Sequence, residues 1–199
     1  MDSGHSMATL ADSEKAVRAG ATGITHLWNA MVPFHHHDPG MVGLLASTSV
    51  SADNPIFFSI IADGIHTKDA ALRIAHRALP EGLVLVTDAM AGLGIGNGTH
   101  NLGLQTVVVS NFRAVIAGSD TLAGSVASMD HCLRYFYKAA RCSIVDALEC
   151  ASLHPAQFLG IQATKGTLGF DSDADFVLIH PDKLTIEATF IAGVLVYER

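Results

Sequence analysis

The sequence predicts an α/β fold in which short parallel strands alternate with helices, followed by a small all-β segment. Up to about residue 160, short apolar runs alternate with amphipathic helical stretches, which is typical of βα units and a parallel sheet. From Lys165 onward the pattern changes to alternating strands around turns. We therefore expect a boundary near residues 160–165, and divide the chain into residues 1–162 and 163–199.

Local patterns predict the first elements of this fold. Residues 10–19 form a helix that a glycine ends, and a short strand follows over residues 23–31. The run IFFSIIAD (56–63) is a buried strand by its length and its content of β-branched residues. Thr67 caps the next helix, and Pro80 ends it.

The second half of the chain is predicted in the same way. LVLVTDAM (83–90) is a strand that ends on a carboxylate, a glycine-rich loop follows, and residues 106–118 form a hairpin. Ser125 caps a helix whose apolar face holds Met129, Leu133 and Phe136. The remaining predictions are a capping box at Ser143 and Asp146, a short turn from Pro155 to Gly160, and strands within 166–180 and 185–198.

Composition and charge exclude several classes of protein. The 199 residues are 49% hydrophobic and 16% charged, which excludes a disordered chain. No apolar stretch approaches the ~18–20 residues of a membrane span, and the N-terminus lacks the pattern of a signal peptide. The net charge of −7 argues against nucleic acid and anionic membranes as partners. Three cysteines, an odd number, favour a reducing compartment, so we expect a cytoplasmic protein.

Polar side chains follow the predicted strands at their carboxyl ends, where parallel α/β folds carry their catalytic groups. His26 follows GIT, Asp63 and His66 follow FFSIIA, Asp88 follows LVLVT, and His5 would end a fourth strand. Neutral imidazoles are zinc ligands, and a carboxylate beside the metal can carry a proton. Each histidine taken singly could instead be a polar structural residue, and Asp88 could be a helix N-cap. Together they favour metal-dependent hydrolysis.

Other patterns are assigned no site. GLGIGNG (92–98) lacks the spacing of a dinucleotide-binding motif, and the HHHDPG stretch is a loop with at most one functional histidine. The aspartates at 171, 173 and 175 resemble the start of a calcium loop, but phenylalanine replaces the required glycine, so we expect a solvated turn. Five histidines are interpreted as structural or surface residues: His76, His100, His131, His154 and His180.

Six motifs in a fixed order connect the chain to a known family. They are GHS, THLWNAMVPFHHHDPG, IADGIH, LVTDAM, TLAGS and the terminal GTL…ADFVLI…AGVLVY. Each motif alone is weak, but together, from His5 to the C-terminus, the chain resembles the N-acetylglucosamine-6-phosphate deacetylases of the amidohydrolase superfamily, in their animal form. The resemblance implies the C-terminal half of a TIM (β/α)₈ barrel, followed by strands of a small β-sandwich. A closed barrel takes about 250 residues, so we expect about half of it here.

The resemblance also implies a site and a reaction. His5 and His26 would bind Zn²⁺, and Asp88 would be the catalytic acid and base. The third protein ligand, a glutamate, is expected upstream and outside this chain. The substrate-binding positions are Asn29, Ala30, His37, Asp63, Gly64, Ile65, His66, Leu122, Ala123 and Gly124. Residues 122–124 match a loop that covers the ligand, and His37 replaces a phosphate-binding arginine.

The function implied is the hydrolysis of N-acetyl-D-glucosamine 6-phosphate to D-glucosamine 6-phosphate and acetate, in amino-sugar catabolism. The partner is a small phosphorylated sugar, with neither nucleic acid nor membrane involved, and the full-length enzyme is expected to be a homodimer. Two alternatives remain open. One is an amidohydrolase that acts on a cyclic amide or ureide, and the other is a non-catalytic remnant.

Overall fold

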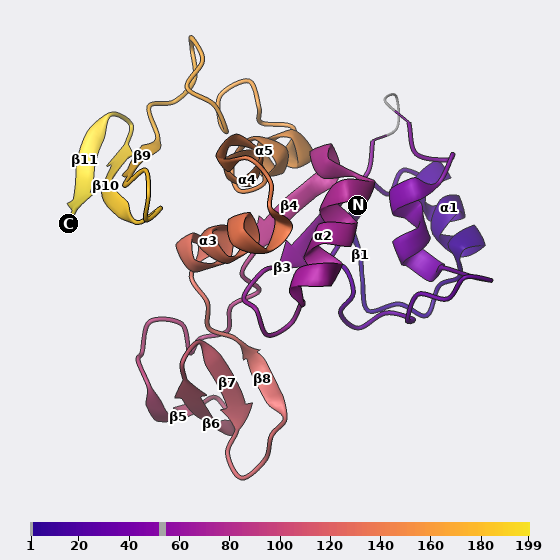
Figure 1. Ribbon diagram of the computed structural model, residues 1–199, viewed down its shortest axis with the longest axis horizontal. Coiled ribbons are helices and arrows are strands. Elements are labelled where there is room, and N and C mark those ends of the chain that lie inside the picture. The colour runs from indigo at the N-terminus through magenta and orange to yellow at the C-terminus, as the bar shows by residue number, and fades with distance from the viewer. Residues whose placement is uncertain (1, 52–54) are drawn as a thin grey trace.

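Four parallel strands form the centre of the structure, a computed structural model that describes residues 2–51 and 55–199. They pair in chain order: β1 (Asp2–Ser3), β2 (Gly23–Ile24), β3 (Phe57–Ile61) and β4 (Leu83–Val86). Figure 1 shows this sheet between the helices, with two separate sheets farther along the chain. The predicted α/β class is confirmed, and the sheet supplies half of the eight strands of a TIM barrel.

Helical segments connect these strands, as the βα pattern predicts. They are α1 (Leu10–Arg18), the 3₁₀ helix η1 (Gly40–Ala46), α2 (Asp69–Ala78) and the 3₁₀ turn η2 (Pro80–Gly82). Thr9 caps α1 by accepting a hydrogen bond from the backbone amide of Asp12. The predicted cap at Thr67 is wrong. Lys68 is the N-cap of α2 without a side-chain hydrogen bond, whereas Thr67 is buried in the protein.

The main core lies between the sheet and the helices that pack on it. Phe58, Ile60 and Leu83 of the sheet are fully buried and belong to one apolar cluster with Leu72 of α2 and Phe136 of the later helix α3. Burying side chains of this size contributes about 1.5–3 kcal/mol each. The strands are therefore held rigidly, which fixes the residues at their ends.

An antiparallel sheet follows β4 and lies apart from the central sheet in Figure 1. Its strands are β5 (Gly98–Leu102), β6 (Gln105–Ser110), β7 (Arg113–Ile116) and β8 (Leu122–Ser125). The predicted hairpin is confirmed as β6 and β7. Two predictions here are wrong: the glycine-rich stretch ends in strand β5, and Leu122, Ala123 and Gly124 lie on strand β8 rather than in a loop.

Three helices lead back over the central sheet: α3 (Met129–Ala140), α4 (Ile144–Glu149) and α5 (Leu153–Leu159). Ser128 is the N-cap of α3, so the predicted cap at Ser125 is wrong, because that residue ends β8. The capping box of Ser143 and Asp146 is confirmed at the start of α4. The predicted turn after Pro155 is instead part of α5, which Gly160 ends in the left-handed conformation.

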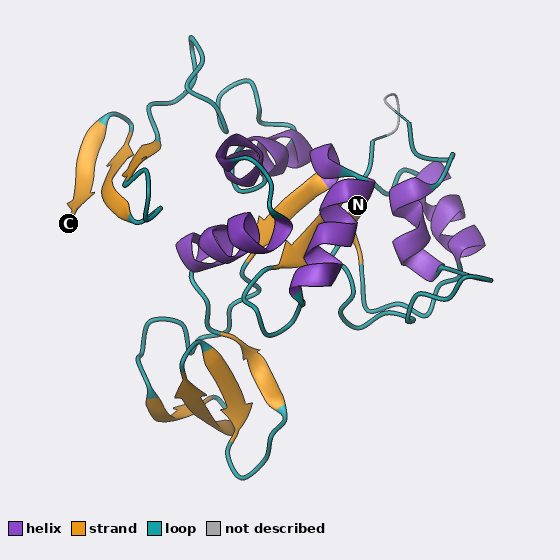
Figure 2. Ribbon diagram, viewed as in Figure 1, coloured by secondary structure: helices purple, strands orange, loops and turns teal. Residues whose placement is uncertain are grey.

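The last sheet is antiparallel, in the order β11 (Val194–Glu198), β10 (Ile186–Ile191) and β9 (Phe176–Ile179). Figure 2 shows it as a separate group of strands that loops connect to α5. Asp173 and Asp175 in the preceding loop form ion pairs with Lys165. The division at residues 162 and 163 stays a prediction. Among the described residues, no helix is long and apolar enough to span a membrane.

Candidate functional site

The register of the parallel sheet brings the predicted site residues to one edge. Ser3 pairs with Ile24, and Phe58 with both Ile24 and Leu83. His5 follows Ser3 by two residues, and His26 follows Ile24 by two residues. Asp63 follows Phe58 by five residues, and Asp88 follows Leu83 by five residues. Since parallel strands point their carboxyl ends the same way, these side chains share one edge of the sheet.

His5 and His26 face each other with their Nε2 atoms 2.8 Å apart. Their ring centroids are separated by 4.7 Å and the rings are tilted by 58°. His26 is buried, whereas His5 is exposed, so one side of the pair is open. When both imidazoles are neutral, the Nε2 atom of at least one ring carries a lone pair that is directed at the other ring.

Strained backbone and a serine position this histidine pair. His5 and His26 have positive φ values of 49° and 28°, which residues other than glycine rarely adopt. The backbone amide of His26 donates a hydrogen bond of 2.7 Å to Ser59 Oγ, and the amide of Leu27 donates to the Ser59 carbonyl. A Cβ on Gly4 would lie 2.3 Å from a Thr25 methyl carbon, so glycine lets the two strand ends approach.

The histidine pair fits two positions of a zinc site. Zinc–nitrogen bonds of about 2.0–2.1 Å at tetrahedral angles place two ligand nitrogens about 3.3 Å apart, so the pair needs to open by only about 0.5 Å. The Nδ1 atom of His26 is buried without a hydrogen-bond partner among the described residues, so no such bond holds its ring against this adjustment. No third histidine, cysteine or carboxylate among the described side chains brings a ligand atom within 4.8 Å of both.

Asp63 and His66 form a buried, hydrogen-bonded pair after β3. The Nδ1 atom of His66 lies 2.6 Å from Asp63 Oδ2, and the other carboxylate oxygen accepts hydrogen bonds from the backbone amides of Ile65 and His66. The Asp63 side chain is completely buried and that of His66 is 16% exposed. This geometry makes Nδ1 of His66 the donor to Asp63 and leaves its Nε2 atom available to a ligand.

The pKa values of the pair move apart. The hydrogen bond from Asp63 raises the pKa of His66 against the effect of burial, and the charges of Asp63 and Asp88 add to the increase. Burial acts to raise the pKa of Asp63, but its hydrogen bonds with the side chain and backbone of His66 and with the Ile65 amide lower it overall. The pair therefore favours a carboxylate beside an imidazolium.

We predict that this pair stabilises the chain most at mildly acidic pH. The lowered pKa of Asp63 gives stability that is complete above its ordinary value of 3.8 and is lost as the pH falls through the folded value. The raised pKa of His66 gives stability that is complete below 6.5 and is lost as the pH rises through the folded value. A double-mutant cycle of Asp63→Asn and His66→Gln in urea should give a coupling of about 1.5–3 kcal/mol between these limits.

The exposed pair of Lys15 and Asp12 is the matched control for this cycle. Its side chains are 70% and 55% exposed, and such pairs couple by only about 0.2–1 kcal/mol. A coupling of Asp63 with His66 that is no larger than this, or that stays constant from acidic to alkaline pH, would show that the pair carries no buried charge.

Asp88 follows β4 and has an exposed side chain on strained backbone, with φ 47°. Its charge acts on His66, so the two residues lie within electrostatic reach. The residues after it, Ala89 and Met90, pair with Ser125 at the end of β8. The edge of the sheet thus brings Asp88 together with His66 and with the strand that carries Leu122, Ala123 and Gly124. The alternative role of Asp88 as a helix cap is excluded, because a turn and strand β5 follow it.

Asn29 and Ala30 belong to the turn behind His26. The Asn29 side chain donates hydrogen bonds of 3.3 Å to the carbonyl oxygens of His26 and Leu27, so it shapes this turn. Ala30 is exposed and has φ 51°. The predicted strand over residues 23–31 is wrong beyond Ile24, because these positive φ values turn the chain away from the sheet.

His37 lies in an exposed loop together with His35 and His36. Its ring stacks on that of His35 with a centroid distance of 5.4 Å, and contacts the His36 ring at 4.2 Å. The next residue, Asp38, accepts hydrogen bonds from the amides of Leu10 and Gly40, which ties the loop to the start of α1. The loop is thereby attached to the segment that follows His5, but no hydrogen bond or ring contact among the described residues places His37 against the histidine pair.

Gly64 lets α3 pack against the loop that carries His66. It has φ +80°, and a Cβ there would lie 2.7 Å from the Tyr135 ring. The Tyr135 hydroxyl in turn donates a hydrogen bond of 2.5 Å to Asp69. Neither Tyr135 nor Ser59 is predicted as a site residue by the sequence, although a serine in the apolar run IFFSIIAD is a visible signal for the second.

We predict that Gly64→Ala destabilises the chain more than Gly94→Ala does. Gly94 has a similar φ of +84°, but a Cβ there meets nothing within 4 Å. Both variants lose about 1–2 kcal/mol through the left-handed conformation, and Gly64→Ala adds about 1–3 kcal/mol for the clash with Tyr135. Urea denaturation measures the difference. Equal losses in the two variants would mean that the loop moves freely away from α3.

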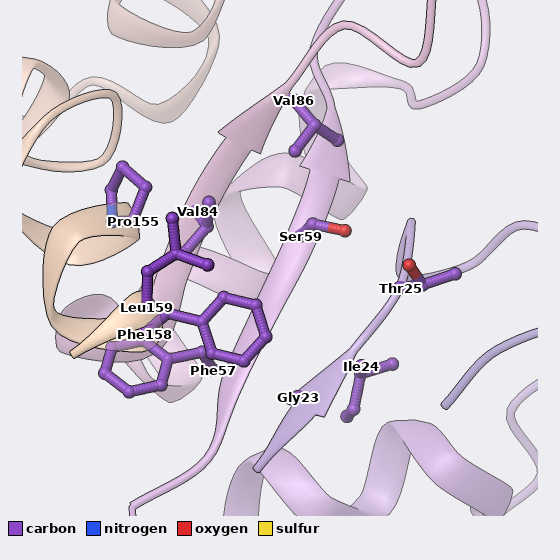
Figure 3. A pocket seen from close by; sticks show the side chains of 10 residues that line it. All are labelled: Gly23, Ile24, Thr25, Phe57, Ser59, Val84, Val86, Pro155, Phe158 and Leu159. Carbon is purple, nitrogen blue, oxygen red and sulfur yellow. The ribbon is translucent and has the colours of Figure 1, made fainter. Parts of the chain in front are cut away.

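An apolar hollow of about 280 Å³ lies between α5 and the face of the sheet opposite to Phe58, Ile60 and Leu83. Figure 3 shows Phe57 of β3 beside Phe158 and Leu159 of α5, with Thr25 and Ser59 as the polar residues at its wall. Barrel interiors are filled by side chains. We therefore assign this hollow to the packing of the barrel, and the site to the edge of the sheet where the strands end.

Comparisons with protein-family models and with curated proteins give consistent matches. The model of the amidohydrolase family matches residues 3–196. An N-acetylglucosamine-6-phosphate deacetylase of Bos taurus is 59% identical over 98% of this chain and 47% of its own length. The Caenorhabditis elegans protein of the same name is 50% identical over 98% of this chain and 46% of its own. The chain thus spans about half the length of these relatives.

Solved structures give the same result for the fold. The N-acetylglucosamine-6-phosphate deacetylase of Thermotoga maritima matches with a TM-score of 0.86 and 29% identity, over 98% of this chain and 52% of that one. A mutant of the Mycobacterium smegmatis deacetylase in complex with N-acetyl-D-glucosamine-6-phosphate matches with a TM-score of 0.82 and 34% identity, over 98% and 50%. The expected half of a barrel with strands of a second domain is therefore confirmed.

Proposed function

Since the chain belongs to the amidohydrolase family, we propose that it supplies one half of a zinc-dependent deacetylase site. The observation that carries this proposal is the pair of Nε2 atoms of His5 and His26, 2.8 Å apart, at the edge that also holds Asp88. A zinc ion bound there would activate a water molecule and polarise the acetamide carbonyl. A catalytic zinc usually has three protein ligands, so the third is supplied from outside this chain.

Two residues at the edge have separate roles in hydrolysis. Asp88 is exposed to solvent at the end of β4, so its carboxylate can take a proton from the attacking water and return it to the leaving amine. His66 donates from Nδ1 to Asp63, so its Nε2 atom can donate a hydrogen bond to the carbonyl oxygen of the acetyl group only when both ring nitrogens are protonated. The raised pKa of His66 favours this charged form, and its charge would strengthen the bond as negative charge develops on the oxygen.

The substrate we propose is N-acetyl-D-glucosamine 6-phosphate, the ligand in complex with the M. smegmatis mutant. His37, which lies in the exposed loop with His35 and His36, would contact the phosphate, as the resemblance implies. An imidazole can donate a hydrogen bond to a phosphate oxygen but lacks the bidentate geometry of an arginine. Residues 29–30, 63–66 and 122–124 would line the sugar.

A chimeric enzyme tests this function. In it, the matching segment of the bovine relative is replaced by this chain, so that the whole barrel is present. The chimera, with zinc, should release acetate from N-acetylglucosamine 6-phosphate faster than from the unphosphorylated sugar. Preference for a cyclic amide or ureide, or a folded chimera without any hydrolysis, would contradict the proposal.

A further inference from the structure

A second group of metal-ligating side chains lies in the helical layer. His76, Cys142 and Asp146 each bring one ligand atom within 4.8 Å of the others, and theirs is the one such group of three among the described side chains. His76 lies in the last turn of α2, Cys142 in the connection between α3 and α4, and Asp146 in the first turn of α4. His76 precedes the start of β4 by seven residues along the chain, whereas His5 and His26 follow the carboxyl ends of β1 and β2.

His76 has a ring nitrogen that the fold leaves unused. Its Nε2 atom is buried and has no hydrogen-bond partner among the described residues. The ring packs edge-on against Phe136, with the centroids 5.7 Å apart. Burial lowers the pKa of His76, so the imidazole is neutral and carries a lone pair. A buried nitrogen without a partner is costly, and a metal ion would satisfy it.

Cys142 and Asp146 complete the donor set. Cys142 is a free, half-buried thiol whose pKa is raised by burial and by the charge of Asp146. The Asp146 carboxylate accepts one hydrogen bond, of 3.1 Å, from the amide of Ser143, and an ionised carboxylate has room for about four. A cation between the two groups would offset the charge of Asp146 and so favour the thiolate form of Cys142.

We propose that His76, Cys142 and Asp146 bind one zinc ion, with water as the fourth ligand. Nitrogen, sulfur and oxygen donors together suit zinc, and a thiolate and a carboxylate balance its two charges. The thiol proton of Cys142 passes to solvent as the sulfur–zinc bond forms, without oxidation or reduction. All three residues are partly exposed, so the ion enters from solvent. The ion would link α2 to the connection between α3 and α4. This role does not depend on the hydrolysis proposed for the other site.

Titration of the metal-free 199-residue chain with Co²⁺ under reducing conditions tests this site. Bound cobalt should show a thiolate-to-metal charge-transfer band at one ion per chain, and Zn²⁺ should abolish the band. The histidine pair at the sheet edge has no thiol, so it cannot produce this signal. Cys142→Ser should remove the band, and His76→Ala should weaken cobalt binding by at least about 10–100-fold, the loss that follows when only the partner of a metal ligand is removed. Cys150→Ala removes a neighbouring buried thiol and is the matched control, which should keep the band.

A measurement on the unmodified chain covers the case in which Cys142→Ser fails to fold. Zinc should slow the alkylation of Cys142 by iodoacetamide. Mass spectrometry of the peptides measures the rate of this reaction. Three results would overturn the proposal: a folded chain without the band, a band that persists in folded Cys142→Ser, and alkylation of Cys142 at the same rate with and without zinc.

Discussion

Replacement of Asp88 by asparagine is expected to lower the turnover of the chimeric enzyme by about 10²–10⁴-fold, the usual contribution of a general acid–base group. The amide keeps the shape of the side chain but cannot accept the proton of the attacking water. Asp88 is an exposed residue, so the stability of the protein should change by less than about 0.5 kcal/mol. Acetate release under saturating substrate measures the effect.

The control for this variant is Asp182→Asn, an exposed aspartate in the loop between β9 and β10. It should leave turnover unchanged. Zinc content should also stay the same in Asp88→Asn, which separates loss of proton transfer from loss of the metal. Near-normal acetate release by Asp88→Asn would remove this residue from its proposed role.

The 199-residue chain alone is expected to release no measurable acetate, whereas the chimera does. His5 and His26 supply two ligands, and no third lies within reach among the described side chains. A site that lacks a ligand binds the metal weakly.

The comparison of the isolated chain with the chimera requires equal amounts of folded protein and an excess of zinc. Circular dichroism and size-exclusion chromatography establish the folded state of the isolated chain. Robust turnover by the chain alone would contradict the proposed half-site, and would mean that another group, such as His35 or His36, completes the metal site.

The strand ends of the site could be predicted because the signal is local. An apolar run that stops at a histidine or an aspartate is visible in the sequence at His26, Asp63 and Asp88, and parallel pairing then brings the ends together. His5 is expected to end a fourth strand, and the resemblance to deacetylases gives it the role of a metal ligand; the strand before it has only two residues. Such a short strand has no hydrophobic pattern of its own.

Other features depend on tertiary contacts that no local pattern contains. Residues 98–102 have the composition of a glycine-rich loop but pair with β6 as a strand, since pairing outweighs weak propensity. Thr67 and Ser125 are good capping residues, yet the first is buried and the second ends a strand. His76 meets Cys142 and Asp146 across about 70 positions of the chain, so their spacing gives no signal.

We propose that His5 and His26 hold the catalytic zinc at the edge of the sheet. The most direct test is the zinc affinity of the chimera, measured by competition with a chelator. The chimera carries Cys142→Ser in this measurement, so that zinc bound at the second proposed site does not contribute. We predict one zinc per chimera, bound at least about 100-fold more weakly after His26→Ala. Unchanged zinc affinity in folded His26→Ala protein would contradict the claim.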